Sequence, residues 1–324
     1  MTESKTPPRG AYLAPLFLFV MATLIPELLI GSTPLSRIHT LLFQFPYYGS
    51  AALLIREAVI RLGLGRAGLV VLCLAFGVIT EGLALQSVFN PHFLNLDISF
   101  GRVGDVNWLW TIYMVGYHAL WSVSIPVTLA GIVFRDRQHD PWLGRIGIGG
   151  FMVLFPVMAV AFHAIFVKMS NFGAPTLPYA GAAVAVTSLI ATGLYLQRGK
   201  SSSGAPPPRV YLPGVLTFLG GLTWLLLYGE IFRSQRVAPA SVNLAAGLLL
   251  AAASSLLSRR VRRGAWSDRH NFSFVAGGLA ANSLFGFVVV SSSTLDTCGQ
   301  IAVVLLVGTG LTLLERRLRQ NPGG

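Results

Sequence analysis

The sequence predicts an all-α protein, a polytopic bundle of about ten membrane-spanning helices with both termini in the cytoplasm. Hydrophobic residues make up 53% of the 324 residues and charged residues only 11%, with a mean hydropathy of +0.66. That is far more apolar than a soluble domain. Apolar stretches of about 20 residues, the length that crosses a hydrocarbon core, recur along the chain. We therefore expect a multi-pass protein of the cell membrane in contact with lipid, in a bacterium the cytoplasmic (inner) membrane.

Ten stretches qualify as spans. They are 12–30, 39–55, 67–86, 108–133, 146–167, 178–196, 210–232, 243–257, 272–290 and 298–314. With the N-terminus inside, all but five of the 24 Lys and Arg residues fall in inner segments. The exceptions are Arg37, Arg102, Lys168, Arg233 and Arg236. This bias predicts the topology, because one span more or fewer would invert every later loop. Whether the short spans 243–257 and 298–314 cross completely stays open.

Composition divides the chain into three parts. Residues 1–198 form six spans with most of the polar residues, 199–209 (GKSSSGAPPPR) read as a flexible cytoplasmic linker, and 210–324 form four spans rich in small residues that favour helix packing. The two cysteines lie far apart and form no CxxC motif, so we expect neither a disulfide nor a redox site. The net charge of +12 is explained by the inner loops, and we expect no nucleic-acid partner.

Several ionisable residues lie inside predicted spans. An ionisable group at the bilayer centre costs roughly 2.5–3.5 kcal/mol, so each is a candidate for function. Glu81, His118 and His163 lie on three successive predicted helices that short loops bring side by side, and we expect them to form a catalytic group in an outward-opening cavity. The residues expected to contact substrate are Gln86, Asn90 and Ser122. Glu27 and Glu230, near span ends, are expected to be structural.

This set of side chains permits several functions. A partly desolvated glutamate can act as a general base, with a histidine orienting water, which predicts a membrane-embedded hydrolase of a peptide or lipid. Two histidines and a glutamate can also bind zinc, but HExxH is absent and we expect neither a metal nor a cofactor. Alternatively, Glu81 titrates or binds a cation in a transporter or small-molecule binding protein, or the chain is a non-catalytic scaffold. The substrate and the oligomeric state are left open.

Further expectations concern the surroundings of these residues. The apolar outer segment 87–107 either lies on the membrane or folds as a lid over Glu81. Arg56 is expected to extend to lipid headgroups, and Glu57 to pair with Arg61 at i, i+4. Aromatic residues are expected at the membrane interfaces. They are Tyr47, Tyr48, Trp108, Trp110, Trp142 and Trp266.

The order of Glu81, His118 and His163 resembles, distantly and in part, the glutamic intramembrane protease superfamily of CAAX proteases and bacteriocin-processing enzymes. That family carries Glu-Glu-x-x-x-Arg, Phe-x-x-x-His and His-x-x-x-Asn/Asp. The segments here read TEGLAL, MVGYH and HAIFV, with Thr80, Leu85, Met114 and Val167 at the other motif positions. The resemblance implies a hydrolase with Glu81 as its base. The pattern GVITEGLALQSVFNP with a later HALWS is also similar to an uncharacterised family of bacterial multi-pass membrane proteins, which implies no activity.

Overall fold

A computed structural model describes residues 12–93, 98–99, 101–196, 209–234, 266–289 and 293–320. The elements are α1 (Leu13–Thr23), η1 (Leu24–Leu29), η2 (Leu35–Thr40), α2 (Leu41–Arg61), α3 (Arg66–Val78), η3 (Ile79–Ala84), β1 (Arg102–Val103), β2 (Val106–Asn107), α4 (Trp108–Tyr117), η5 (His118–Ser124), α5 (Ile125–Val133), η6 (Arg135–Arg137), α6 (Arg145–Ser170), α7 (Thr176–Tyr195), α8 (Leu212–Ser234), α10 (Asp268–Val289) and α11 (Thr294–Gln320). The segments η1, η3 and η5 are π-helical.

The all-α bundle is confirmed for the part of the chain that the structure describes. Its helical stretches that are long and apolar enough to cross a membrane number seven. They are Arg66–Ala84, Trp108–Val133, Arg145–Ser170, Thr176–Tyr195, Leu212–Gly229, Asp268–Val288 and Thr294–Gln320. Leu13–Leu29 is a shorter apolar helix. The predicted span 243–257 lies outside the described residues, so ten spans stay a prediction.

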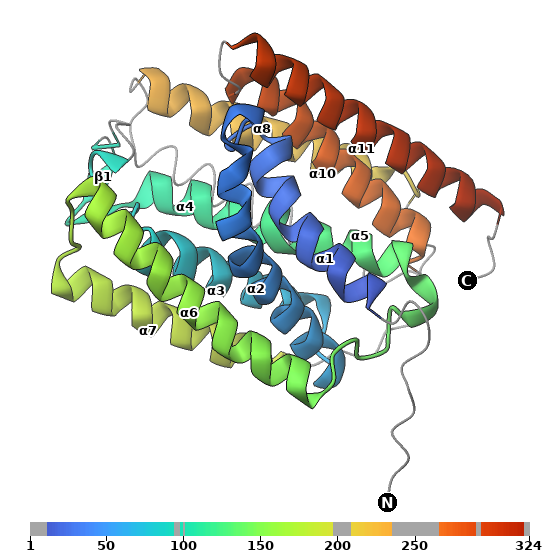
Figure 1. Ribbon diagram of the computed structural model, residues 1–324, viewed down its shortest axis with the longest axis horizontal. Coiled ribbons are helices and arrows are strands. Elements are labelled where there is room, and N and C mark those ends of the chain that lie inside the picture. The colour runs from blue at the N-terminus through green and yellow to red at the C-terminus, as the bar shows by residue number, and fades with distance from the viewer. Residues whose placement is uncertain are drawn as a thin grey trace, which may run out of the picture.

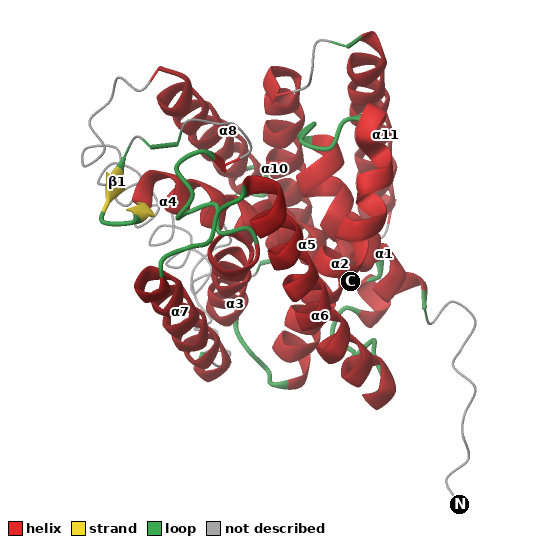
Figure 2. Cartoon of the chain, turned by 60° about the vertical axis from the view of Figure 1, so that its left-hand side comes forward, coloured by secondary structure: helices red, strands yellow, loops and turns green. Residues whose placement is uncertain are grey.

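The helices form a broad bundle with α6 and α7 on one side, α8, α10 and α11 on the other, and α1 to α5 between them (Figure 1). The outer helices expose large apolar side chains such as Ile146, Leu177 and Leu306. In water such faces are unfavourable, whereas in a bilayer they contact lipid. A two-stranded antiparallel hairpin, β1 and β2, precedes α4 at the edge of the bundle (Figure 2).

Contacts between loops agree with the alternating direction of the predicted spans. The guanidinium of Arg135 lies 3.1 Å from a carboxylate oxygen of Asp268, and both residues belong to predicted inner segments. At the other end, the backbone N–H of Ser36 donates to Asp296 over 2.8 Å. Segments expected on one side of the membrane therefore lie together, while the side that faces the cytoplasm stays a prediction.

The C-terminal helices contact the first half of the bundle directly. Trp121 Nε1 donates to the carbonyl of Gly278 over 2.8 Å, so α10 packs beside η5. Within the C-terminal part, α8 and α10 approach so closely that a Cβ at Gly277 would lie 2.1 Å from the carbonyl oxygen of Gly214. This close approach is the role expected of small residues in lipid. The three-part division stays a prediction, and linker residues 199–208 lie outside the described residues.

Candidate functional site

Three π-helical segments position the polar residues of the core. Glu27 lies in η1, Glu81 in η3 and His118 at the start of η5. A π-helical turn inserts an extra residue and interrupts the regular i to i−4 hydrogen bonds, and such turns are frequent at functional sites. Proline contributes locally, because Pro26 within η1 and Pro126 just after η5 have no N–H to donate.

Side chains satisfy the backbone carbonyls of η1. Tyr117 donates through its hydroxyl to the carbonyl of Pro26 over 2.8 Å, and the Asn282 amide donates to that of Ile25 over 2.8 Å. In lipid, an unsatisfied carbonyl costs several kcal/mol. Residues from α4 and α10 thus make the irregular segment compatible with a buried position.

Glu81, His118 and Ser122 form a hydrogen-bonded chain at the centre of the bundle. Nε2 of His118 lies 2.7 Å from Oε1 of Glu81, and Nδ1 of His118 lies 2.9 Å from Oγ of Ser122. Glu81 is 1% exposed, His118 3% and Ser122 0%. The structure therefore brings together three of the six predicted site residues, and it shields them from solvent.

The second oxygen of Glu81 has a partner that sequence reasoning missed. The Ser87 hydroxyl donates to Oε2 of Glu81 and accepts a hydrogen bond of 3.0 Å from Nε1 of Trp110. The chain can turn back toward Glu81 because Gln86 adopts a positive φ of 55° directly before Ser87. Ser87 immediately follows the predicted span that carries Glu81. This position could have identified it as a partner of that carboxylate.

Two tyrosines of α2 extend this network toward Glu27. The Tyr48 ring stacks on the His118 ring, with centroids 5.9 Å apart, and its hydroxyl donates to Oε1 of Glu27 over 2.8 Å. The Tyr47 hydroxyl lies 3.0 Å from Oγ1 of Thr80. Both tyrosines are buried, so the predicted position at the membrane interface is wrong for them. It is also wrong for Trp110 and Trp142, which are buried, whereas Trp108 is exposed.

His163 belongs to a separate cluster. Its Nδ1 lies 3.1 Å from Nε2 of Gln86 and 2.9 Å from the carbonyl oxygen of Leu83. Oε1 of Gln86 in turn accepts from the backbone N–H of Ala174 over 2.7 Å. His163 and Gln86 thus connect α6 and the α6–α7 loop to η3. Asn90 lies elsewhere, where its Oδ1 accepts from the N–H of His92 over 2.9 Å.

The described part of segment 87–107 folds onto the bundle rather than lying on the membrane. Val88, Phe89 and Ile98 are buried. The backbone N–H of Asn107 donates to the carbonyl of Val88 over 2.8 Å, which closes the segment into a loop. With Ser87 bonded to Glu81, the start of this loop covers the carboxylate. Residues 94–97 and 100 lie outside the described residues.

In the described part of the chain no metal cluster surrounds the pair, and its side chains are shielded from solvent. Among these residues, no group of three or more His, Cys, Asp and Glu side chains is placed to hold a metal ion. Two pockets, of about 420 and 30 Å³, are lined by other residues than Glu81, His118 and Ser122. The side chain of Glu230 lies outside the described residues. The pair is therefore a closed polar site.

A second buried charge cluster lies at the predicted cytoplasmic end of α2. Glu57 accepts from Arg56 over 2.8 Å and from Arg61 over 2.9 Å, so the predicted i, i+4 pair is confirmed. Arg56 does not extend to lipid headgroups as expected. It is buried, and its guanidinium lies 3.5 Å from the ring centroid of Trp142. The backbone N–H of Trp142 also donates to Glu57 over 2.7 Å, so this cluster fixes the loop before α6.

The fold and this site define a class, the polytopic α-helical membrane proteins with a buried carboxylate–imidazole pair. More specifically, residues 16–318 match the model of an uncharacterized membrane protein family, and the chain belongs to that family. This confirms the expected likeness to uncharacterised multi-pass membrane proteins, and it gives no support to the likeness to CAAX proteases. Neither a curated protein nor a solved structure matches the chain.

Proposed function

We propose that this membrane protein binds and releases a proton at the Glu81–His118 pair, as part of the transport or binding of a small solute. The observation that carries the proposal is the 2.7 Å contact between Nε2 of His118 and Oε1 of Glu81 in a site that excludes solvent. Ionisable residues at this depth commonly mark ion or proton pathways in membrane proteins.

The chemistry of the pair favours a state in which the two groups share one proton. With one proton between them, the carboxyl and imidazole are neutral overall, whether the proton resides on Glu81 or on His118. Gain or loss of one proton leaves a net charge in a buried site, where it is costly. Among the described residues, the only basic side chain that contacts Glu81 is His118. The two groups therefore act as one unit that shares a proton.

A polar connection leads from the pair toward the predicted outer surface. The Tyr48 ring lies on His118, and the Tyr48 hydroxyl donates to Glu27. Oε2 of Glu27 accepts from Ser32 over 3.0 Å, and Ser32 is exposed. Glu27 thus links solvent to the ring that covers His118. The hydrogen-bonded chain from solvent ends at the Tyr48 hydroxyl, and the last contact with His118 is ring stacking. Proton exchange with the outer side therefore requires Tyr48 to move off the His118 ring.

Infrared difference spectroscopy of the full-length protein in nanodiscs tests the proposal. A pH titration is expected to show a buried carboxyl C=O band that gains and loses intensity in the wild type. The band should be absent in Glu81→Gln and shifted in His118→Gln, because the hydrogen-bond partner changes. Glu315→Gln is the matched control, since that carboxylate lies on α11 and pairs with Arg319. A carboxyl signal that persists in Glu81→Gln would contradict the proposal.

A hydrolase is the second candidate, and the order Ser122–His118–Glu81 favours it. A hydroxyl, an imidazole and a carboxylate in hydrogen-bonded sequence is the arrangement that activates a serine nucleophile. Ser122 is fully buried, so a substrate could reach it only after the side chains around it had moved. Labelling by a fluorophosphonate that is lost in Ser122→Ala and in His118→Gln would favour the hydrolase. A water-activating role of Glu81 predicts instead that turnover is lost in Glu81→Gln and kept in Ser122→Ala.

A further inference from the structure

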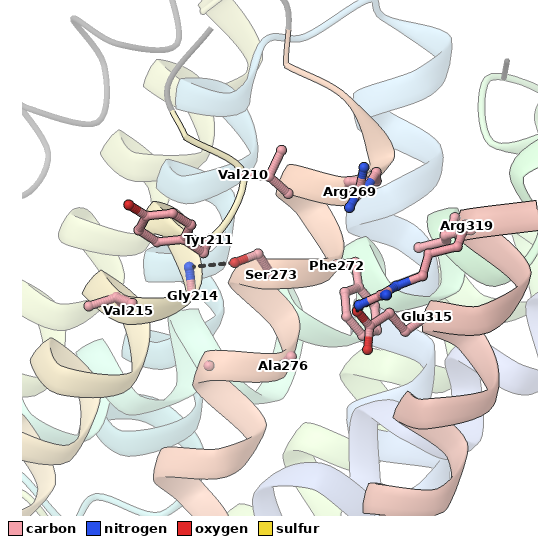
Figure 3. A pocket seen from close by; sticks show the side chains of 12 residues that line it. Val210, Tyr211, Gly214, Val215, Arg269, Phe272, Ser273, Ala276, Glu315 and Arg319 are labelled. Carbon is pink, nitrogen blue, oxygen red and sulfur yellow. Dashed lines mark hydrogen bonds and ion pairs between the residues drawn. The ribbon is translucent and has the colours of Figure 1, made fainter. Parts of the chain in front are cut away.

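A pocket of about 420 Å³ lies where α8 and α10 begin and α11 ends (Figure 3). Tyr211 and Val215 at the start of α8 lie on one side of it, and Glu315 and Arg319 of α11 lie on the other. Arg269, Phe272 and Ser273 of α10 lie between them. The positive-inside pattern predicts that this end of the bundle lies in the cytoplasmic leaflet. The pocket is distinct from the Glu81–His118 pair.

The charge at the pocket is positive. Arg269 lines it, is exposed, and has no ion-pair partner among the described residues. Arg319 lines it too, and its charge is offset by Glu315, whose Oε1 lies 2.5 Å from Nη2 of Arg319. Arg209 donates to the Tyr211 hydroxyl over 2.8 Å and adds a further cation at the rim.

The remaining wall is apolar and suits a ligand with a hydrocarbon part. Val215, Phe272, Ala276 and Leu318 line the pocket, and Gly277 lines it where α8 and α10 pack closely. The Ser273 hydroxyl is occupied, because it accepts from the backbone N–H of Gly214 over 3.0 Å. Basic residues over an apolar groove between cytoplasmic helix ends are typical of sites for acidic lipid headgroups.

We propose that this pocket binds the phosphate of an acidic phospholipid from the cytoplasmic leaflet. Arg269 and Arg319 contact the phosphate, and the apolar wall receives the first carbons of an acyl chain. A free phosphate ion shares the charge chemistry but lacks the apolar part. The lipid should therefore bind far better than inorganic phosphate.

Lipid titration into the full-length protein in neutral detergent tests this site. Fluorescent phosphatidylglycerol is expected to bind saturably and phosphatidylcholine weakly. Arg269→Gln and Arg319→Gln should each lower the affinity for phosphatidylglycerol about fivefold, which is the effect of one basic residue near an anionic headgroup. Glu315→Gln should strengthen it by a similar factor, because a negative charge leaves the pocket. Arg316→Gln is the matched control, since Arg316 is exposed on the same helix and does not line the pocket.

Filling the pocket gives an independent test. Ala276→Leu should lower the affinity for phosphatidylglycerol at least as much as either arginine variant. Ala280→Leu, which is one turn further along the helix and exposed, should leave the affinity unchanged. Equal affinity for the two lipids would overturn the proposal. An unchanged affinity in the double variant Arg269→Gln with Arg319→Gln would also overturn it, as would weaker lipid binding in Glu315→Gln. Competition by inorganic phosphate at the lipid's own concentration would overturn the lipid assignment and leave a free-anion site.

Discussion

The contact between Glu81 and His118 can be measured with a double-mutant cycle. His118→Leu removes the imidazole that lies 2.7 Å from Oε1 of Glu81, while Ser87 still donates to Oε2. Leaving one oxygen of a buried carboxyl without a partner costs about 1–3 kcal/mol, and more if the carboxyl is charged. Glu81→Gln keeps the shape and the acceptor, so we expect a loss of only about 1 kcal/mol.

The two changes together should cost less than their sum. With Gln at 81, His118→Leu no longer strands a carboxylate, so we expect a coupling free energy of about 1–3 kcal/mol. The reasoning would be refuted if the stability losses of the two single variants sum to that of the double variant within about 0.5 kcal/mol, because the effects of groups that do not interact are additive to that extent. Leu305→Ala, an exposed position on α11, serves as the uncoupled partner in a control cycle.

The chain supplies its own probe of unfolding. It contains two cysteines, of which Cys73 is buried and Cys298 exposed. In a Cys298→Ala background, a thiol-reactive fluorescent dye reports only the exposure of Cys73. Titration with a denaturing detergent then gives the free energy of unfolding of each variant under one set of conditions.

Three further changes have defined outcomes. Tyr48→Phe removes the hydroxyl that donates a hydrogen bond to Glu27, so it should lower the free energy of unfolding by about 1 kcal/mol in the same assay. It should also shift the infrared carboxyl band. An unchanged spectrum would argue against coupling of the Glu27 and Glu81 sites. Gly277→Val places a Cβ 2.1 Å from a backbone oxygen and should destabilise by more than about 2 kcal/mol, whereas Gly310→Val, with nothing within 4 Å, should be tolerated. Trp142→Leu removes the ring under a buried guanidinium and should cost about 1–2 kcal/mol; a neutral effect would contradict this.

The sequence was sufficient to predict the helical membrane class and the proximity of Glu81 and His118, although it grouped His163 with them. Both follow from composition, from charge in the loops and from the rarity of ionisable groups in apolar spans. It did not predict that His163 bonds to Gln86 instead, because that depends on how far α6 rotates about its axis. A π-helical turn inserts one residue and so changes which side chains face a neighbouring helix.

The aromatic residues illustrate the same limit. An aromatic side chain near a span end is typical of an interfacial anchor, and Trp108 fits that description. Tyr48 is expected at an interface as well, yet it is buried, and its hydroxyl donates a hydrogen bond to Glu27. Only the folded chain shows that Glu27 and Tyr48, on different helices, occupy one polar cluster. Neither propensity nor periodicity encodes such a pairing.

The energetics of the pair bear on the choice between a scaffold and a protein that uses the site. Replacing a buried ion pair by well-packed apolar residues is often neutral or stabilising by about 1–4 kcal/mol. Irregular helical turns also need outside partners for their carbonyls, as Pro26 shows with Tyr117. A protein that served only as a scaffold would be more stable without the buried pair and without the irregular helical turns. We therefore expect the double change Glu81→Leu with His118→Leu to leave stability equal or higher while removing the infrared proton signal. A strong loss of stability in that double variant would instead assign the pair to the fold itself.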